Sequence, residues 1–354
     1  KQDNVVQYDN SGRSNKLVVR YGEVSGNQAN NSTIESLINQ MKSNPTGTYE
    51  LTCDLYASKY NVDTLFDFEF RGTLNGNGYT IKNLKGTLFN TLNNATIENL
   101  FIENANVTRT RGIIANSATD TTLTNVHIKD SSVDVKDIKY IGGLIGEATR
   151  VTIDKCSATN IKVNSNTTGV GGLIGKSTDN SIIRDSYITG VVSGSNNCIG
   201  GMVGEVLAFE EMTIGDCYAK VELKANNKPG IGGIIGSSIM ADIQMQDTIS
   251  LADGDYGNRI IGSEYDPAYI NARNVYELSG SKLKTNADCG VREINKNYIN
   301  NYFFNTTLRL DSSIWDIPSN ASIDNLPTLI TDKKTTNTTT DSTIVNRIED
   351  IDAY

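Results

Sequence analysis

The sequence predicts an all-β protein, a right-handed parallel β-helix closed by a helix at its start and by an irregular segment at its end. Two observations predict this solenoid. A motif of the form Gly-Gly-apolar-apolar-Gly recurs at residues 142–146, 171–175, 200–204 and 232–236. A second phrase precedes each copy, with apolar or small residues at its second, fifth and seventh positions, as in residues 122–128. Repeats of this length are typical of one supersecondary unit per repeat, stacked on its neighbours.

Each repeat is predicted to consist of short strands. The fifth and seventh positions of the phrase alternate as in a strand with one buried face, and neither motif has the period of a helix. β-branched residues are abundant, and the 354 residues include 5 prolines, which also favours strands. We expect about six turns between residues 84 and 262, with one or two more before them. The right-handed sense follows the general preference of connections between parallel strands.

The glycines of the repeat are interpreted as structural. A glycine next to a strand lets the chain turn where a side chain would clash, or adopt a positive φ. The positions are Gly142, Gly143, Gly146, Gly171, Gly172, Gly175, Gly200, Gly201, Gly204, Gly232, Gly233 and Gly236.

Residues 1–47 are predicted to form an N-terminal segment and a capping helix. Residues 16–21 resemble a strand, and a capping box at residues 32–35 then opens an amphipathic helix that ends before Pro45. Its apolar face holds Ile34, Leu37, Ile38 and Met41. A helix laid across the open end of a β-helix protects the exposed edge and core.

The β-helix itself is assigned to residues 48–262, a C-terminal cap to residues 263–330 and a linker or tail to residues 331–354. The repeat is lost after Gly262. The Thr-, Asn-, Asp- and Lys-rich composition after residue 331 is typical of a flexible linker.

Within the predicted cap, residues 274–278 resemble one more strand and residues 299–310 a short helix. Trp315 is the single tryptophan of the chain. We expect the region around it to close the far end of the solenoid.

Composition excludes several classes of partner. The chain is acidic, with a net charge of −9 and no basic run, which argues against nucleic acid and anionic membranes. No apolar stretch reaches the length that spans a bilayer. The sequence starts at Lys1 without a methionine or a signal peptide, which is typical of a processed protein or a fragment. We expect a monomer.

The five cysteines are Cys53, Cys156, Cys198, Cys217 and Cys289. None lies in a CxxC motif, so a zinc knuckle is not expected. Cys156 and Cys217 occupy the same position of the phrase two turns apart, which places them about 9.6 Å apart at about 4.8 Å per turn. That separation is too long for a disulfide, so both are interpreted as buried free thiols. The pairing of the other three is left open.

His127 is the only histidine. It occupies the sixth position of its phrase, which is predicted to face outward, and we interpret it as solvated rather than catalytic. The sequence contains no HExxH motif, so no catalytic residue of a zinc peptidase is assigned to this chain.

Three aspartates, Asp185, Asp216 and Asp247, recur at the fourth position of the phrase. They are predicted to stack about 4.8 Å apart. The favoured interpretation is that Asp and Asn suit a corner of the backbone there. A weak calcium site and a glycosidase carboxylate pair are the alternatives. The even spread of the charges and the scarcity of aromatic residues argue against an enzyme.

The glycine motif resembles the GLUG repeat of bacterial surface proteins. Residues 48–58, 70–84 and 86–100 are similar to the N-terminal, non-catalytic region of the M26 zinc metallopeptidases, the family of immunoglobulin A1 proteases of streptococci and their relatives. The resemblance covers roughly residues 46–330.

The resemblance implies a secreted, cell-wall-associated protein whose β-helix lies upstream of a zinc catalytic domain. Zinc is then expected only in that domain, and this chain needs no cofactor of its own. It would recognise host immunoglobulin A1 or another host glycoprotein, or act as a spacer. The alternatives are a β-helix adhesin without a protease and a polysaccharide lyase or hydrolase.

Overall fold

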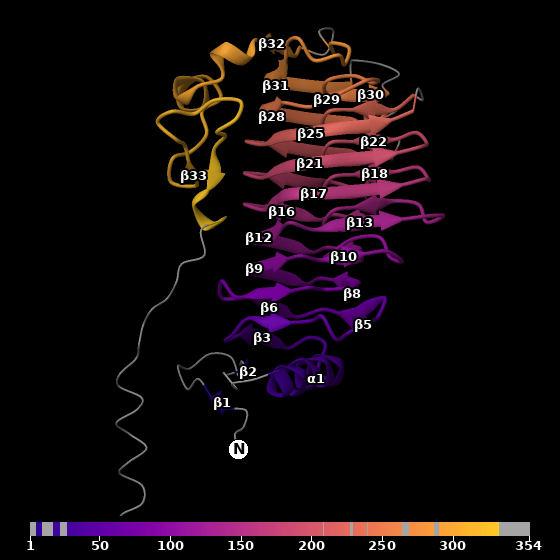
Figure 1. Ribbon diagram of the computed structural model, residues 1–354, viewed down its shortest axis with the longest axis vertical. Helices are drawn as coiled ribbons and strands as arrows, with labels where there is room; N and C mark the ends of the chain where they lie inside the picture. Colours follow the sequence, from indigo (N-terminus) through magenta and orange to yellow (C-terminus); the bar gives the residue numbers. More distant parts are fainter. Residues whose placement is uncertain are drawn as a thin grey trace, which may run out of the picture.

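Strands stack turn upon turn into a parallel β-solenoid, drawn upright in Figure 1. The computed structural model describes residues 5–8, 17–21, 27–207, 209–226, 229–238, 240–263, 269–286 and 290–332, with side chains from Ile34 onward. The predicted all-β parallel β-helix is confirmed, and the described residues form about eight turns.

The largest sheet carries the repeated phrases and has twenty strands within the described ranges. Its strands are β1 (Val5–Tyr8), β2 (Leu17–Tyr21), β3 (Thr48–Leu51), β4 (Leu55–Tyr56), β6 (Thr73–Asn75), β7 (Thr80–Lys82), β9 (Thr96–Glu103), β10 (Asn106–Val107), β12 (Thr122–Lys129), β13 (Ser132–Val135), β16 (Thr152–Asp154), β17 (Ser157–Ser165), β20 (Ser181–Arg184), β21 (Tyr187–Gly194), β24 (Glu211–Gly215), β25 (Tyr218–Ala225), β28 (Asp242–Ser250), β29 (Asp253–Gly254), β31 (Ile270–Leu278) and β32 (Arg292–Ile294).

Two smaller sheets complete the wall. One of them has one strand per turn: β5 (Thr64–Phe70), β8 (Thr87–Asn93), β11 (Ala115–Thr119), β15 (Ile145–Thr149), β19 (Ile174–Thr178), β23 (Val203–Val206), β27 (Ile235–Ser237) and β30 (Ile261–Ser263). The third sheet holds the first glycine of each motif: β14 (Ile141–Gly142), β18 (Val170–Gly171), β22 (Ile199–Gly200) and β26 (Ile231–Gly232).

The glycine motifs lie directly above one another, as the pairing of β14, β18, β22 and β26 shows. A Cβ atom on Gly143 would lie 2.0 Å from the carbonyl oxygen of Gly172. A Cβ atom on Gly201 would lie 1.9 Å from the carbonyl oxygen of Gly233. The close approach of successive turns, rather than an unusual φ, therefore requires glycine at these two positions.

The fourth position of the phrase is a corner in the left-handed region of φ. Its φ lies between 42° and 55° at Asn99, Asn125, Lys155, Asp185, Asp216 and Asp247. Asn and Asp tolerate this conformation better than most residues. The corner explains why the second and fifth positions, which lie on either side of it, are three residues apart, whereas the fifth and seventh positions alternate as in a strand.

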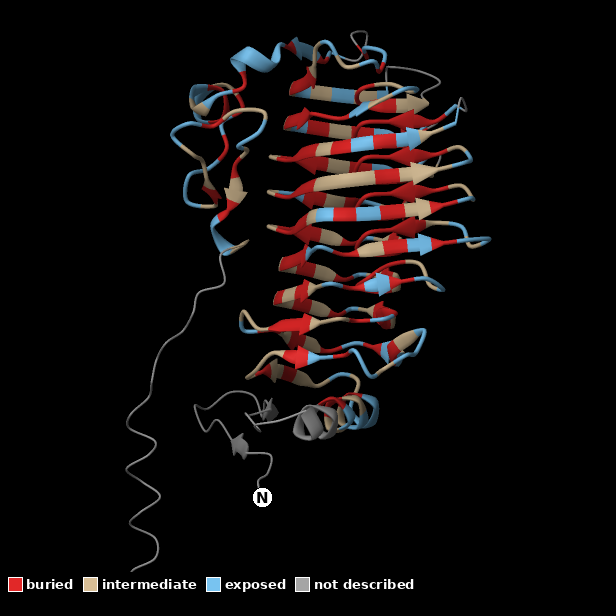
Figure 2. Cartoon of the chain, viewed as in Figure 1, coloured by how far each residue is buried: buried red, intermediate tan, exposed pale blue. Residues whose placement is uncertain are grey.

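One continuous core runs through the stack, and Figure 2 shows buried residues in every turn. Cys156 and Cys217 are fully buried free thiols inside it, as predicted. Burial raises the pKa of Cys156 to about 12. Cys198 is also buried and Cys53 is half-buried, whereas Cys289 lies outside the described residues.

The capping helix is confirmed as α1 (Asn27–Ser43), which lies at the first end of the stack (Figure 1). Its residues Ile34, Leu37 and Met41 are buried in the core. The predicted start at the capping box is wrong, because the helix begins five residues earlier, directly after Gly26. Residues 27–31 contain no proline or glycine that would stop it.

Parallel pairing continues beyond Gly262, because β31 pairs with β28 and β32 pairs with β31. Residues 295–332, here called the C-terminal strap, then run back along the flank of the solenoid (Figure 1). The strap contains η3 (Lys296–Tyr298), η4 (Phe303–Thr307), β33 (Trp315–Asp316), β34 (Thr328–Leu329) and η5 (Ile330–Asp332). The prediction that the Trp315 region plugs the far end is therefore wrong. The predicted linker also starts too early, since Asp332 is packed against the solenoid; residues 333–354 lie outside the described residues.

Candidate functional site

The sixth position of the phrase forms an outward-facing column along one flank. Pairing of the strands places one residue of each turn in this column, and the strap covers it. The members are Phe101, His127, Ser157, Tyr187, Tyr218, Ile249 and Tyr276. Large side chains that leave the core on successive turns need a cover of their own, and the strap supplies it.

The upper part of the covered flank is an aromatic cluster. Tyr187 and Tyr218 stack with ring centroids 4.7 Å apart and an angle of 18° between the ring planes. The Trp315 ring lies 5.9 Å from Tyr187 and 5.8 Å from Tyr218, and Trp315 is 1% exposed. The hydroxyl of Tyr218 donates a hydrogen bond of 2.7 Å to the carbonyl oxygen of Pro327. This second, smaller core is separate from the interior of the solenoid.

The lower part of the flank is a buried polar cluster around Asp332. Ser157 Oγ donates to Asp332 Oδ1 at 2.6 Å, and Tyr187 donates its hydroxyl proton to Oδ2 at 2.5 Å. His127 Nδ1 lies 2.7 Å from Oδ1, and the backbone N–H of Leu329 donates to Oδ2 at 3.0 Å. Burial acts to raise the pKa of Asp332, but the hydrogen bonds from His127, Ser157 and Tyr187 outweigh it and lower the pKa below its ordinary value.

His127 faces outward, as its position in the phrase predicts, but the prediction that it is solvated is wrong. The strap covers it and leaves it 4% exposed. Its other ring nitrogen, Nε2, is buried and has no hydrogen-bond partner within the described part of the chain. The ring of Phe101 lies 4.9 Å from the imidazole, centroid to centroid.

The residues Ser157, His127 and Asp332 are those of a hydrolytic triad, but their geometry is not. In a triad, one imidazole nitrogen accepts the serine proton while the other donates to the aspartate. Here Ser157 Oγ and Asp332 Oδ1 both lie at Nδ1, at 3.0 Å and 2.7 Å, and the serine hydroxyl donates to the carboxylate instead of to a base. The arrangement holds the strap and does not activate the serine.

Two pockets lie at the lower end of the strap. A pocket of about 240 Å³ borders Phe101, Ser157 and Asp332. A second pocket, of about 260 Å³, lies between three turns of the solenoid and the end of the strap. Its lining includes Asn99, Phe101, Asn125, His127, Ile330 and Thr331. Asn125 Oδ1, like His127 Nε2, is buried and has no hydrogen-bond partner among the described residues.

The three aspartates of the fourth position lie in one column, as predicted, and the strap contacts two of them. Trp315 Nε1 donates to Asp185 at 3.4 Å, and an Arg309 guanidinium nitrogen donates to Asp247 at 2.7 Å. Burial, followed by repulsion from Asp185 and Asp247, raises the pKa of Asp216 to about 6. Across the residues that the structure describes, no three His, Cys, Asp or Glu side chains are grouped so as to hold a metal ion. The φ values of this column fit the corner interpretation.

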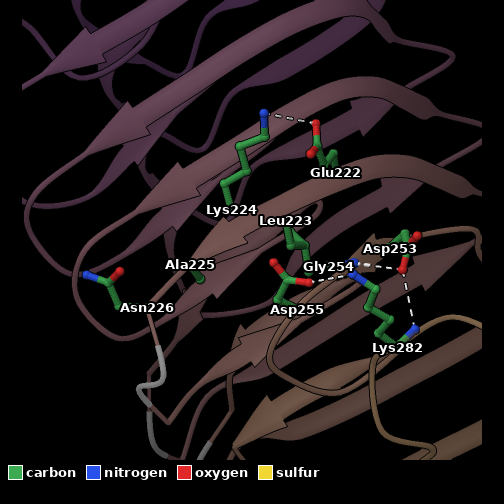
Figure 3. A pocket seen from close by; sticks show the side chains of 9 residues that line it. All are labelled: Glu222, Leu223, Lys224, Ala225, Asn226, Asp253, Gly254, Asp255 and Lys282. Carbon is green, nitrogen blue, oxygen red and sulfur yellow. Dashed lines mark hydrogen bonds and ion pairs between the residues drawn. The ribbon is translucent and has the colours of Figure 1, made fainter.

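A larger groove of about 440 Å³ lies near the upper end of the wall (Figure 3). Its charged side chains pair with one another: Lys224 Nζ lies 3.2 Å from Glu222, and Lys282 Nζ lies 2.7 Å from Asp255. A fifth charged side chain, Asp253, also lines the groove, which is therefore polar with a formal charge of −1. Its described lining contains no Ser, Cys or His.

Sequence reasoning identified His127 and the aspartates but missed the cover over the outer column. The signal was present, because Tyr187 and Tyr218 stand at an outward-facing position on successive turns. The part played by Asp332 had no such signal, since it lies in a stretch without a repeat.

The start of the chain matches a known family. Residues 1–130 match the family model described as the M26 IgA1-specific metallo-endopeptidase N-terminal region. An immunoglobulin A1 protease of Streptococcus sanguinis is 31% identical over 150 residues, which are 39% of this chain and 8% of that protein. Halomucin of Haloquadratum walsbyi is 38% identical over 92 residues, 23% of this chain and 1% of that protein. The resemblance to the N-terminal region of the M26 peptidases is confirmed, and the chain spans a small part of these curated relatives.

Two solved structures share the fold. A candidate immunoglobulin A1 protease from Bacteroides ovatus aligns over 92% of this chain and 94% of its own, with a TM-score of 0.59 and 15% identity. A structure named IgA1 protease aligns over 70% of this chain and 21% of its own, with a TM-score of 0.56 and 20% identity. At these identities the likeness concerns the fold alone. Over the described residues, no helix has the length and apolar character needed to cross a membrane.

Proposed function

We propose that this chain is a non-catalytic recognition or spacer domain of a larger, secreted cell-surface protein, an IgA1 protease-like zinc metallopeptidase. The observation that carries the proposal is the match of residues 1–130 to the N-terminal region of the M26 family. The proposal also agrees with the absence of HExxH from the sequence and with its single histidine, His127, which contacts Asp332 instead of a reacting group. Zinc is then expected in a separate catalytic domain.

The partner that we propose is host immunoglobulin A1 or another host glycoprotein. The solenoid presents long walls of stacked strands, and such walls suit an extended partner because each turn adds another row of contacts. The net charge of −9 is suited to a protein partner rather than to nucleic acid.

The test is a biosensor titration of the full chain against human IgA1, with IgA2 and the Fc fragment of IgA1 as controls. Saturable binding to IgA1 alone supports recognition of the part that distinguishes IgA1 from the controls. If the chain does not bind IgA1 at concentrations of tens of micromolar, recognition of IgA1 is overturned and the spacer role remains as the proposal. Cleavage of IgA1 by the chain in the presence of zinc overturns the non-catalytic part of the proposal.

A second candidate function is an adhesin without a protease. The match to halomucin, a protein that is not named as a protease, favours it because it shows a similar sequence in a different setting. The reading frame that follows Tyr354 in the gene separates the two candidates, since an HExxH motif downstream supports the protease.

A further inference from the structure

Two large apolar side chains lie exposed beside each other on the surface of the solenoid. Phe209 is 81% exposed and Met240 is 37% exposed. The backbone N–H of Phe209 donates to the carbonyl oxygen of Met240 at 2.9 Å, so the two residues occupy neighbouring turns, one above the other. Phe209 and Met240 are here called the corner patch, because each lies where the chain turns from β23 into β24 or from β27 into β28.

The same corner is polar in the earlier turns. It directly follows the ends of β8, β11, β15 and β19, which pair in register, and its residues there are Asn94, Asp120, Arg150 and Asp179. Their φ values lie between 48° and 51°, and Arg150 forms ion pairs with both aspartates. Phe209 and Met240 share the left-handed conformation, with φ of 66° and 56°. The corner thus keeps its backbone conformation and changes its side chains from polar to apolar.

Phenylalanine and methionine are costly residues for this corner. Asn and Asp tolerate the left-handed region, whereas a bulky side chain there is an outlier. A ring that is 81% exposed also gains little of the free energy that burial of apolar surface provides. A place where the chain breaks two local rules without a gain in packing is typical of a functional site. The corner patch is therefore suited to a partner that buries it.

Three carboxylates border the corner patch: Glu210, Glu211 and Asp242. Glu211 and Asp242 are exposed and lie opposite each other in the register of β24 and β28. The backbone N–H of Asp242 donates to the carbonyl oxygen of Glu210 at 2.8 Å, which places the third residue next to them. Among the residues that the structure describes, no lysine or arginine forms an ion pair with any of the three; Asp242 accepts a hydrogen bond of 2.7 Å from Gln244. Like charges at neighbouring positions repel, so added cations are favoured here.

We infer that the corner patch docks a segment of a partner protein that presents one large apolar side chain flanked by lysine or arginine. The apolar side chain covers Phe209 and Met240, and the flanking cations meet the three carboxylates, which gives the complementarity of charge that selects a partner. A second copy of this chain fits poorly, because its net charge is −9 and it has no basic run. An anionic membrane is repelled by the same carboxylates. The inference goes beyond recognition of IgA1 and stands whether or not IgA1 binds.

Met240 supplies its own reporter for the test. The chain has five methionines, and the other four, Met41, Met202, Met212 and Met245, are at most 2% exposed. The full chain labelled with ¹³C at its methionine methyl groups therefore gives one NMR signal from the corner patch. The four interior signals report whether the fold is intact.

The labelled chain is titrated with three short peptides. The first carries a central leucine–phenylalanine pair flanked on both sides by lysine and arginine. The second replaces the central pair by two serines, and the third replaces the basic residues by glutamate. Vesicles of phosphatidylglycerol and phosphatidylcholine test a membrane as the occupant, and dilution of the chain alone tests a second copy.

The first peptide should shift the Met240 signal saturably, with a Kd of about 0.1–1 mM because the corner patch is small. The four interior signals should stay in place, and the other two peptides should bind about tenfold more weakly or less. Absence of a saturable shift with the first peptide overturns the inference, and so does equal binding of either other peptide. A shift produced by the vesicles or by dilution also overturns it, because the occupant is then a membrane or a second copy.

Two variants and two matched controls locate the binding. Phe209→Asn introduces a residue that suits the corner and should weaken binding of the first peptide about tenfold or more. Glu211→Gln removes one carboxylate and should weaken it about twofold to fivefold. The controls are Tyr298→Asn, at a ring that is 70% exposed on the strap, and Asp67→Asn, at an exposed carboxylate of β5. Both should bind as the unchanged chain does, and all four variants should keep the interior signals. If Phe209→Asn binds as tightly as the controls, the peptide lies elsewhere and the inference is overturned.

Discussion

Inside the solenoid, Ile153, Ile183 and Ile214 lie directly above one another, and each is fully buried. On the covered flank, successive turns place different chemistry in one column, from the imidazole of His127 to the phenol of Tyr187. In the interior, each of the about eight turns repeats the same kind of contact with its neighbours. The flank depends on a single segment, the strap, whose few side chains each hold several turns: Asp332 contacts His127, Ser157 and Tyr187.

This difference shows which contacts are repeated in the molecule and which occur once. Interior stability is shared among similar interfaces between turns, as in other repeat proteins. The strap has no second copy, so a few contacts decide whether it stays docked. Changes inside should act on the whole solenoid, and changes on the flank should act on the strap first.

The largest effect is expected from Gly201→Ala. The added Cβ atom would lie 1.9 Å from the carbonyl oxygen of Gly233, so two turns would have to separate. We expect a loss of about 4 kcal/mol or more in the free energy of unfolding, measured by urea denaturation of the soluble protein or seen as failure to fold.

The matched control is Gly280→Ala. Gly280 has a φ of +83° but nothing within 4 Å of the added Cβ atom, so the cost is confined to backbone strain of about 1–2 kcal/mol. Equal losses for the two variants would contradict the view that contact between turns is what requires glycine in the repeat.

Trp315→Ala should have the second-largest effect, and it should be local. Removing a fully buried tryptophan side chain costs about 3–5 kcal/mol, and this side chain packs on Tyr187 and Tyr218. We expect hydrogen exchange to rise in residues 295–332 while the strands of the interior stay protected. The control is Tyr302→Ala, at a position that is 67% exposed. If exchange rises throughout the solenoid in the Trp315 variant, the strap and the interior unfold as one cooperative unit and the effect is not local.

Asp332→Asn tests the polar end of the strap. The folded pKa of Asp332 lies below its ordinary value of 3.8. Its carboxylate therefore stabilises the docked strap above that value, and this contribution is lost as the pH falls through the lowered pKa. At neutral pH we expect the variant to weaken docking by about 1–3 kcal/mol.

Fluorescence of Trp315, the only tryptophan, reports docking directly. The unchanged protein should lose the spectrum of the docked strap only below about pH 4. Asp332→Asn should already be shifted at neutral pH and respond less to acid. A variant spectrum identical to that of the unchanged protein at every pH would show that the carboxylate does not hold the strap.

The same comparison explains what the sequence could predict. Periodicity revealed the interior and the corners, because every turn repeats the pattern and each copy supports the others. The predicted start of α1 was wrong because the capping box at residues 32–35 is only a local signal. The helix extends back through residues 27–31, which contain no proline or glycine to stop it. The bond between Asp332 and His127 had no periodic signal, since a contact between a repeat and an aperiodic segment leaves no pattern in either.

The smallest predicted effect is a gain in stability from Asp216→Asn. Burial and the neighbouring Asp185 and Asp247 raise the pKa of Asp216 to about 6 from 3.8, so the charged form is disfavoured in the folded protein. The carboxylate thus costs stability above about pH 6, and the cost disappears as the pH falls towards 3.8. Asparagine tolerates the φ of 55° at this corner and removes the charge. We expect a gain of roughly 1 kcal/mol at neutral pH, because the side chain is half exposed and water screens the repulsion.

The matched control is Asp130→Asn, at an exposed corner with a φ of 50°. It should leave the free energy of unfolding nearly unchanged at every pH. Urea denaturation of both variants at pH 7 and at pH 4 decides the matter. At pH 4 the Asp216 carboxyl is protonated in the folded protein and is as uncharged as asparagine. A gain for Asp216→Asn that persists at pH 4 would therefore contradict the electrostatic cause and would indicate better packing of asparagine under the strap.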